Sequence, residues 1–383
     1  MSEKNNKYTP ILRFPEFTGE WVEKKLGDSF QERTEKNRDD LPLLSLGEEG
    51  LSYQSETTRK DNSSADKSKY LRVAIGDIAY NTMRMWQGRC VFVDKEGIVS
   101  PAYTVCKPKE GIDSMFHYYL FKTDGMIKKF HQNSQGLVSD TLNLKYEAFS
   151  KIKYCLPTEP AEQQKIASCL SAMDDLIAAQ AEKVEALKEK KTGLMQQLFP
   201  QPGETTPRLR FPEFTGEWEE YEFGDCFEIG SGRDYKHLDN GHIPVYGSGG
   251  YMCSVNDYLY DGESACIGRK GTINNPILLS GKFWTVDTLF YTYNYVNTTA
   301  YFIYLLFQNI DWMKHNEAGG VPSLSKNIIN KIKVFIPSLT EQQKISECLS
   351  ALDDQIAAET EKLTALKDYK KGLMQQLFPQ PAK

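Results

Sequence analysis

The sequence has few of the features that mark membrane-spanning, secreted or disulfide-stabilised proteins. Among its 383 residues, no apolar run approaches the roughly 18 residues that a membrane span requires. The first residues, MSEKNNKYTP, lack the apolar stretch of a signal peptide. The eight cysteines form no CxxC pair, which argues against a disulfide framework and against a zinc ribbon. We therefore expect a cytoplasmic chain with reduced thiols.

Signatures of metal binding and catalysis are also scarce. The five histidines are not spaced as metal ligands, and neither GxGxxG nor GxxxxGK[ST] occurs. The segment 274–277 reads NNPI. It lacks the second proline and the aromatic residue of the Asn-Pro-Pro-aromatic motif of adenine methyltransferases, so we interpret it as a turn. These absences predict a chain without catalytic activity of its own.

An excess of positive charge is missing too. Lysine and arginine total 46 against 52 aspartate and glutamate, a formal net charge of -6. Proteins that bind nucleic acid by themselves are usually basic. The composition is 40% hydrophobic and 26% charged, a balance that predicts a folded protein with a substantial core and excludes wholesale disorder.

Two segments occur twice. Residues 12–21 and 209–218 both read LRFPEFTGEW, an offset of 197 residues. The 41 residues from Glu162 match those from Glu341 at 30 positions, with an offset of 179. The segments between these repeats, 22–161 and 219–340, show no comparable similarity. The pattern predicts a duplicated half-protein whose frame was kept while its inserts diverged, and repeats this long are not those of a solenoid.

The longer repeat predicts a coiled-coil helix. Ten positions in each copy follow 4-3-4-3 spacing, and eight of the ten are apolar; such a period over more than four heptads is typical of a coiled-coil seam. Each helix is expected to end near Leu-Phe-Pro-Gln-Pro. The apolar seam positions are Ile166, Leu170, Met173, Ile177, Val184, Leu187, Leu194, Leu198, Ile345, Leu349, Leu352, Ile356, Leu363, Leu366, Leu373 and Leu377.

The remaining two seam positions are polar in both copies, Gln180 and Lys191, then Glu359 and Lys370. Polar seam residues favour one register rather than stability. If the two helices pair antiparallel, they form a spacer of about 50 Å with one insert near each end. Two alternatives stay open: each helix packs only on its own globular neighbour, or the seam also accepts helices of another chain.

Both inserts read as mixed, strand-rich domains. Alternating or β-branched runs at 70–80, 90–94, 264–272 and 282–291 predict strands. Short helices are expected at 115–130 and 299–314. The predicted class is therefore α+β: two strand-rich domains joined by two long antiparallel coiled-coil helices in a pseudo-two-fold repeat. The expected parts are 1–157, 158–203, 204–337 and 338–383.

Loops of the inserts carry side chains suited to DNA. Arginine, glutamine and asparagine have forked donors and acceptors that fit base edges, and glycines allow close approach to a groove or phosphate. We take Trp86 and Trp284 as more typical of core residues, and a single loop arginine as more often solvated; the clustering carries the prediction. The candidate DNA-binding residues are Arg59, Lys60, Asn81, Arg84, Trp86, Gln87, Arg89, Arg233, Lys236, Tyr246, Ser248, Tyr251, Arg269, Lys270 and Thr272.

The charge of the inserts limits this prediction. Residues 22–157 hold 21 basic against 19 acidic residues, and residues 219–337 hold 9 against 13. Phosphate contacts supply most of the affinity for DNA, so another subunit is expected to provide much of that attraction.

Taken together, the pieces resemble the specificity (S) subunit of type I restriction-modification enzymes. The resemblance spans nearly the whole chain: LRFPEFTGEW opening each half, EQQKI entering each long helix and GLMQQLFP closing it. Inside the inserts, 76–88 with 99–103 resemble one class of target-recognition domain, and 246–250, 269–272 and 283–288 resemble another.

The resemblance implies that each insert reads one half of a bipartite, asymmetric double-stranded DNA target. It also implies that the helices set the half-site spacing and dock two methyltransferase (M) subunits. Such a complex uses S-adenosylmethionine on M, with ATP and Mg on the restriction (R) subunits and no cofactor in this chain. Two other hypotheses remain: a non-catalytic coiled-coil scaffold whose inserts bind proteins or carbohydrates, and a self-sufficient nuclease.

Overall fold

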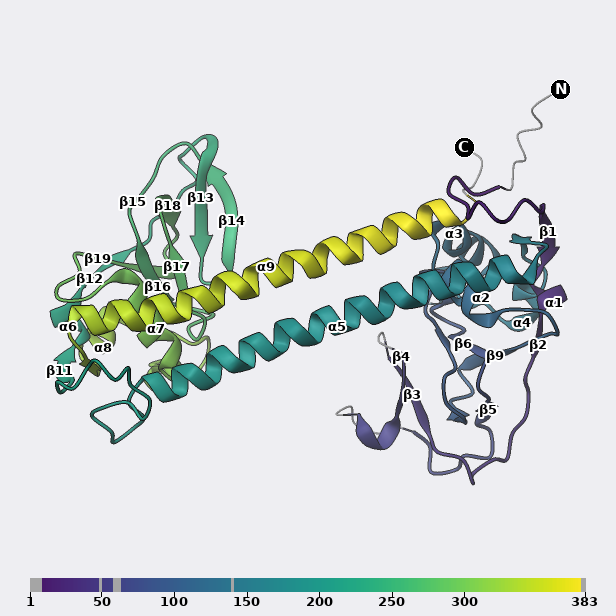
Figure 1. Cartoon of the computed structure of the whole chain (residues 1–383), viewed down its shortest axis with the longest axis horizontal. Coiled ribbons are helices and arrows are strands. Elements are labelled where there is room, and N and C mark those ends of the chain that lie inside the picture. The colour runs from purple at the N-terminus through teal and green to yellow at the C-terminus, as the bar shows by residue number, and fades with distance from the viewer. Residues whose placement is uncertain (1–8, 48–49, 58–62, 139–140, 380–383) are drawn as a thin grey trace. The chain divides into compact units, whose positions relative to one another are not determined.

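The structure is a computed structural model that describes residues 9–47, 50–57, 63–138 and 141–379. The chain forms two compact units. The first unit comprises Met1–Gln180 with Lys362–Lys383, and the second comprises Ala181–Glu361. Each unit thus combines one insert with part of each long helix. Figure 1 shows the inserts and the two long helices along the chain.

In the first unit, strands and short helices alternate before the long helix begins (Figure 1). The elements are β1 (Trp21–Lys25), α1 (Leu26–Ser29), β2 (Phe30–Glu32), β3 (Leu44–Gly47), β4 (Gly50–Tyr53), η1 (Gln54–Glu56), β5 (Leu71–Val73), β6 (Ile78–Asn81), η2 (Met85–Gln87), β7 (Cys90–Phe92), β8 (Gly97–Val99), β9 (Tyr103–Pro108), α2 (Ser114–Phe121), α3 (Asp124–Asn133), α4 (Tyr146–Phe149), β10 (Lys153–Pro157) and α5 (Pro160–Leu198).

The second unit follows a parallel order. Its elements are β11 (Glu219–Glu222), α6 (Phe223–Cys226), β12 (Glu228–Ser231), β13 (Asn240–Gly247), β14 (Gly250–Val255), β15 (Tyr260–Asp261), β16 (Ser264–Gly268), β17 (Ile277–Leu279), β18 (Lys282–Thr285), β19 (Leu289–Tyr293), α7 (Ala300–Asn309), η4 (Trp312–His315), α8 (Lys326–Asn330), β20 (Lys333–Ile336) and α9 (Leu339–Leu377).

The two inserts contain the same central sheet although their sequences differ. The first has the strand order β2-β9-β6-β7, and the second has β12-β19-β16-β17. Every neighbouring pair in both sheets is antiparallel. The second insert adds a sheet of order β14-β13-β18-β15, and the first adds the pairs β3-β4 and β5-β8. Duplication therefore extends into the inserts at the level of topology.

The strands that flank each insert pair with each other. Strand β1 runs antiparallel to β10, with Trp21 opposite Pro157, and β11 runs antiparallel to β20, with Glu219 opposite Ile336. Each insert is thus closed at its base by a two-stranded ribbon, directly before a long helix. This pairing explains how inserts of different length fit the same frame.

In each unit, the LRFPEFTGEW segment contacts the start of a long helix through one buried glutamate. Both Arg13 nitrogens Nε and Nη2 lie 2.7 Å from the Glu162 carboxylate, and the Trp21 indole N–H donates to the same group at 3.1 Å. In the second unit, Arg210 and Trp218 bind Glu341 in the same way, at 2.7 and 3.3 Å. The LRFPEFTGEW segment therefore fastens the start of its long helix.

The long helices are 39 residues each and start and stop where the sequence predicts. Pro160 stands at the first position of α5, where a missing N–H costs no hydrogen bond. Pro200 and Pro379 follow the ends of α5 and α9, where a proline ring would block the next turn. Phe199 and Phe378, just past the helix ends, are buried in the cores of the second and first units.

Within each unit, α5 and α9 pack together, and all the predicted apolar seam residues are buried or half-buried. In the second unit, Lys183 pairs with Glu359 and Lys191 with Asp353, so residue numbers rise along α5 while they fall along α9. The helices are therefore antiparallel there. In the first unit, Lys370 of α9 pairs with Asp174 of α5.

Several expectations about the short elements were wrong. The helix expected at 115–130 is two helices, because Thr123 interrupts it and its hydroxyl accepts from the Met126 N–H at 3.4 Å as the N-cap of α3. The strand expected at 282–291 is two strands in different sheets, β18 and β19, separated at Val286–Thr288. The helix expected at 299–314 ends at Asn309 and is followed by η4.

Candidate nucleic-acid interface

In the first unit, the loop between β6 and β7 is held by a buried methionine. Met85 is fully buried within η2 beneath the loop. Gly88 has φ of 74° and lies so close to α3 that a Cβ there would come within 2.9 Å of Ile127. Both constraints fix the loop on the domain surface, and they leave the side chains of Arg84, Gln87 and Arg89 exposed.

Two of the predicted residues in this loop serve the loop itself. The Asn81 side-chain oxygen accepts from the Met83 N–H at 2.9 Å. The Trp86 indole donates to the Met83 carbonyl at 2.9 Å, and its half-buried ring meets His131 edge-on at 5.8 Å between centroids. Trp86 therefore shapes the loop as a partly buried residue.

Neighbouring segments tie the first loop at both sides. The Thr82 N–H donates to the Ala102 carbonyl at 3.1 Å, and the Leu144 N–H donates to the Thr82 carbonyl at 2.8 Å. The segment before Leu144 carries two exposed apolar residues, Leu137 and Val138. The candidate surface of the first unit thus has three parts: the β6–β7 loop, the turn before β9 and the segment between α3 and α4.

The loop between β16 and β17 is tied in the same manner in the second unit. The Arg269 N–H donates to the Thr288 carbonyl at 2.8 Å, and the Leu324 N–H donates to the Arg269 carbonyl at 2.9 Å. Because β16 occupies the sheet position of β6, and β19 that of β9, Thr82 and Arg269 are equivalent positions. Each loop follows the equivalent strand of its sheet, β6 or β16, and each carries cations, although the two loops share no sequence motif.

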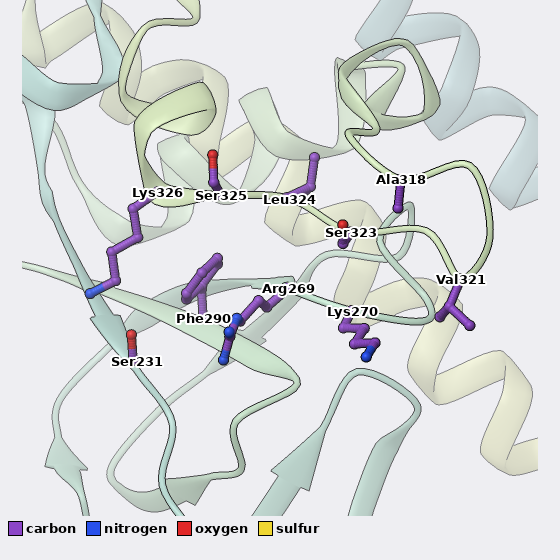
Figure 2. Close-up of a pocket in the computed structure, with 10 residues that line it drawn as sticks. All are labelled: Ser231, Arg269, Lys270, Phe290, Ala318, Val321, Ser323, Leu324, Ser325 and Lys326. Carbon is purple, nitrogen blue, oxygen red and sulfur yellow. The ribbon is translucent and has the colours of Figure 1, made fainter.

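An open cavity of about 770 Å³ beside the second loop gathers three cations (Figure 2). We call it the cationic cavity. One side is formed by the segment from Ala318 to Lys326 and the other by Arg269 and Lys270, with Phe290 and Ser231 at its floor. Its lining is Ser231, Arg269, Lys270, Phe290, Ala318, Val321, Ser323, Leu324, Ser325 and Lys326.

A second open cavity, of about 800 Å³, lies in the same unit. We call it the mixed cavity, because its lining includes two carboxylates, one lysine, two tyrosines and the glycine-rich turn between β13 and β14. The lining is Asp234, Tyr235, Lys236, Gly247, Ser248, Gly249, Gly250, Tyr251, Met252, Val286, Asp287 and Thr288. Ser248 Oγ donates to the Lys270 carbonyl at 2.9 Å, so the two cavities adjoin.

The structure thus brings together most of the candidate residues of the second insert. Arg269 and Lys270 line the cationic cavity, and Lys236, Ser248 and Tyr251 line the mixed cavity. Tyr246 instead packs in a core cluster beneath the turn, with its ring 6.1 Å from that of Tyr251. Thr272 and Arg233 are exposed outside both linings.

The other described residues singled out in the sequence lie outside both cavities. Trp284 is buried, and its indole donates to the Arg233 carbonyl at 2.8 Å, as expected of a core residue. Burial raises the pKa of Tyr291, and the charge of Arg233 opposes that rise, which places the guanidinium near β19. Arg59 and Lys60 of the first insert lie outside the described residues.

Several cavity residues were not among the candidates predicted from the sequence. Lys326, Ser231, Ser323 and Ser325 line the cationic cavity, and Asp234 and Asp287 line the mixed one. Lys326 reaches the cavity from more than 50 residues beyond Arg269, and the hydroxyls sit in ordinary turn sequences. Only the Gly-rich segments beside them could have drawn attention to these positions.

The fold and its paired loops define an internally duplicated protein with two recognition surfaces of different sequence. The family model of the type I restriction modification DNA specificity domain matches residues 18–189 and again 215–368, so the chain belongs to that family. It is accordingly a DNA sequence-specificity subunit of the type I restriction-modification class.

Among curated relatives, the chain is similar to the type I restriction enzyme MjaVIII specificity subunit of Methanocaldococcus jannaschii. The two are 23% identical over 422 residues, which cover 98% of this chain and 95% of the relative. The EcoDI specificity subunit of Escherichia coli is 24% identical over 162 residues, 42% of this chain and 36% of that protein.

Two solved structures share the fold. The crystal structure of a type I restriction-modification S subunit from M. genitalium matches with a TM-score of 0.65 and 17% identity, covering 98% of this chain and all of that one. A chain from a structure on complex assembly and conformational transition of the type I R-M system matches with a TM-score of 0.58 and 13% identity, over 94% and 99%. None of these comparisons supports the scaffold alternative. In the part of the chain that the structure describes, no helix is long and apolar enough to cross a membrane.

Proposed function

We propose that each insert reads one half of a bipartite DNA target and that the chain confers this sequence specificity on methyltransferase subunits. The observation that carries the proposal is the pair of equivalent loops: the same sheet position presents Arg84, Gln87 and Arg89 in one unit and Arg269 and Lys270 in the other. One scaffold that presents two different sets of side chains to DNA suits a target whose halves differ.

The test is a domain exchange. Residues 22–157 are replaced by the corresponding insert of another specificity subunit, and methylated adenines are mapped across a genome for both proteins. We expect one half of the methylated sequence to change and the other half to stay the same. A change in both halves, or in neither, contradicts the modular assignment. Because β1 and β10 close the insert at its base, the exchange preserves the frame.

The two long helices are the proposed docking surface for two M subunits. Support comes from the first unit, where Leu176 of α5 and Tyr369 of α9 are 47% and 61% exposed despite their size. In this proposal the M subunits hold S-adenosylmethionine and carry out adenine methylation, and they supply much of the phosphate attraction that an acidic chain cannot provide alone. R subunits, with ATP and Mg, add DNA cleavage in the cytoplasm, and the chain itself contributes no catalytic group.

A further inference from the structure

The two cavities of the second unit differ in charge although their linings are joined by the Ser248–Lys270 hydrogen bond. Among the described residues lining the cationic cavity there are three cations and no carboxylate. The mixed cavity has Asp234 and Asp287 against the single cation Lys236. We infer that the cationic cavity binds the phosphate backbone of the second half-site and that the mixed cavity reads its base edges. This inference rests on the proposed function.

The cations of the first cavity are placed to bind an anion. The Lys326 ammonium donates one hydrogen bond to the Ile229 carbonyl at 2.6 Å and lies 5.9 Å from the Phe290 ring centroid. An ammonium has three donors, so two N–H groups remain for a ligand in this geometry. The tether fixes the ammonium at the wall, which reduces the entropy lost when a phosphate binds.

Arg269 is positioned by its own loop. Its guanidinium donates to the Asp287 carbonyl at 3.2 Å, and its backbone is held by Thr288 and Leu324. A guanidinium has five donors, so the bond to Asp287 leaves most of the fork available to a phosphate. Figure 2 shows the Arg269 guanidinium directed into the cavity between Lys326 and Lys270, with the hydroxyls of Ser231, Ser323 and Ser325 along the edges.

The mixed cavity is unsuited to phosphate and suited to base edges. Two carboxylates repel an anion, whereas a carboxylate accepts a hydrogen bond from an exocyclic amino group such as N4 of cytosine. Lys236 can donate to guanine, and the Ser248 hydroxyl, whose proton goes to the Lys270 carbonyl, can still accept from a base, so the site offers both donors and acceptors. The glycines of the β13–β14 turn, Gly249 and Gly250, let the backbone approach a groove closely.

This division also explains how an acidic insert can bind DNA. The basic residues of insert two are few, yet Arg269, Lys270 and Lys326 converge on one cavity. Phosphate contacts fix register without sequence information, and base contacts specify. Separating the two in different cavities lets a change in the mixed cavity alter the target while the backbone contacts persist.

The experiment uses the full chain assembled with its methyltransferase partner and a duplex carrying the sequence methylated by the wild-type complex. Affinity is measured from 50 to 300 mM salt for Arg269→Gln, Lys270→Gln and Lys326→Gln. Each should make the slope of log K against log salt shallower by about 0.9, the value for one phosphate contact, and leave the methylated sequence unchanged. Lys282→Gln and Lys331→Gln, exposed lysines of the same unit outside both cavities, should leave the slope unchanged.

The second arm tests the mixed cavity. Asp234→Asn and Asp287→Asn should change or relax the second half of the methylated sequence, leave the first half intact and leave the salt slope no shallower. Lys326→Arg, which keeps the charge, should retain the wild-type slope and so separates loss of charge from loss of fold.

Three outcomes overturn the inference: cavity variants that behave as the lysine controls, cavity variants that alter the methylated bases at unchanged slope, and aspartate variants that leave the sequence unchanged. A wild-type complex without sequence-specific methylation would instead contradict the proposed function.

Discussion

The Lys191 ammonium lies 2.7 Å from the Asp353 carboxylate, and the same carboxylate accepts from the Tyr301 hydroxyl at 2.9 Å. The first unit repeats this arrangement with Lys370, Asp174 and Tyr119, where the Tyr119 hydroxyl donates to Asp174 at 2.7 Å. The two seam lysines that break the apolar pattern thus have matching acidic partners on the opposite helix. Each group joins both long helices to the helix of its insert that carries the tyrosine.

Removing the acid should cost more than removing the base. The Lys191 side chain is 11% exposed and Asp353 is 37% exposed, so Asp353→Ala leaves the more buried charge unpaired. We expect Asp353→Ala to lower the free energy of unfolding by about 2 kcal/mol and Lys191→Met by about 1 kcal/mol, with the double variant Lys191→Met/Asp353→Leu close to wild type. Denaturant unfolding of all three variants measures these differences.

The matched control is the exposed pair Lys188–Glu185, 51% and 66% exposed on the same helix. Its removal should change stability by less than about 0.5 kcal/mol. Equal effects from Lys191 and Lys188 substitutions would show that the seam group does not stabilise the helix pair.

In each unit one buried glutamate accepts hydrogen bonds from an arginine and a tryptophan, and we call this arrangement the glutamate clasp. The two clasps should contribute equally to the free energy of unfolding of their units. Glu162 and Glu341 are almost fully buried, and each accepts from an arginine and a tryptophan. Glu162→Ala leaves the Trp21 and Arg13 donors without their acceptor, and we expect it to cost about 3 kcal/mol. Glu341→Ala should cost the same in its own unit. Limited proteolysis, which reports each unit separately, should cut unit one in the first variant and unit two in the second.

The control for the clasp is Glu159→Ala. Glu159 accepts a hydrogen bond from the Gly19 N–H at 3.0 Å and lies one turn before Glu162. We expect a cost below about 1 kcal/mol. A clasp variant as resistant to protease as the Glu159 variant would contradict the assignment.

The repeats, the positions where the long helices start and stop, and the α+β class could be predicted from the sequence because periodicity and proline leave local marks. The common sheet could not. A half-buried strand needs only apolar residues at alternate positions, so β6 and β16 share a place without sharing residues. The equivalence of Thr82 and Arg269 became visible only through backbone hydrogen bonds, which sequence comparison does not register.

Only part of the candidate surface could be predicted, because some of its residues are brought there by tertiary folding and carry no local sequence signal. Arg269 and Lys270 stood out because glycines flank them, whereas Lys326 sits in an ordinary helical start and reaches the cavity through tertiary folding. At Thr123 a local signal was present but was overlooked. The hydrophobic residues on both sides suggested one helix, whereas the N-cap hydrogen bond of the threonine divides it in two.

A buried histidine should make the first unit sensitive to mild acid. His117 is fully buried: its Nδ1–H donates to the Asp113 backbone carbonyl at 2.7 Å, its Nε2 lies 2.9 Å from the Tyr154 hydroxyl, and burial lowers its pKa to about 4. The unfolded chain therefore takes up the proton first, so stability is present above pH 6.5 and is lost as the pH falls toward 4. We expect a loss of about 2 kcal/mol between pH 8 and pH 5.

His117→Gln provides the comparison for this titration. Glutamine does not titrate, so the variant should lose less stability than wild type over the same pH range, whatever its stability at pH 8. Urea unfolding of both proteins at several pH values, followed by fluorescence, measures the difference. Parallel pH profiles would rule out His117 as the titrating group.

The helices should set the distance between the two half-sites. Insertion of four residues in the 177–190 stretch lengthens α5 by about 6 Å. If the helix pair is the spacer, the gap in the methylated sequence should change while both half-sites keep their bases. Mapping of methylated adenines checks this, and an unchanged gap would show that another part of the complex fixes the spacing. Substituting four exposed residues without insertion, for example at Glu182, Glu185, Lys188 and Glu189, is the length-matched control.

Arg84 and Gln87 are expected to read the first half-site because the η2 turn exposes both while Met85 anchors it. Loss of a bidentate base contact costs about 1–3 kcal/mol of discrimination at one base pair. Arg84→Ala and Gln87→Ala should therefore relax one position each in the first half-site and leave the second half-site unchanged. Lys95→Ala removes a charge from the same unit outside this loop and should leave every position intact. Because the equivalent loop of the second unit contacts a separate half-site, a change that appears in the second half would contradict the pairing of loops with half-sites.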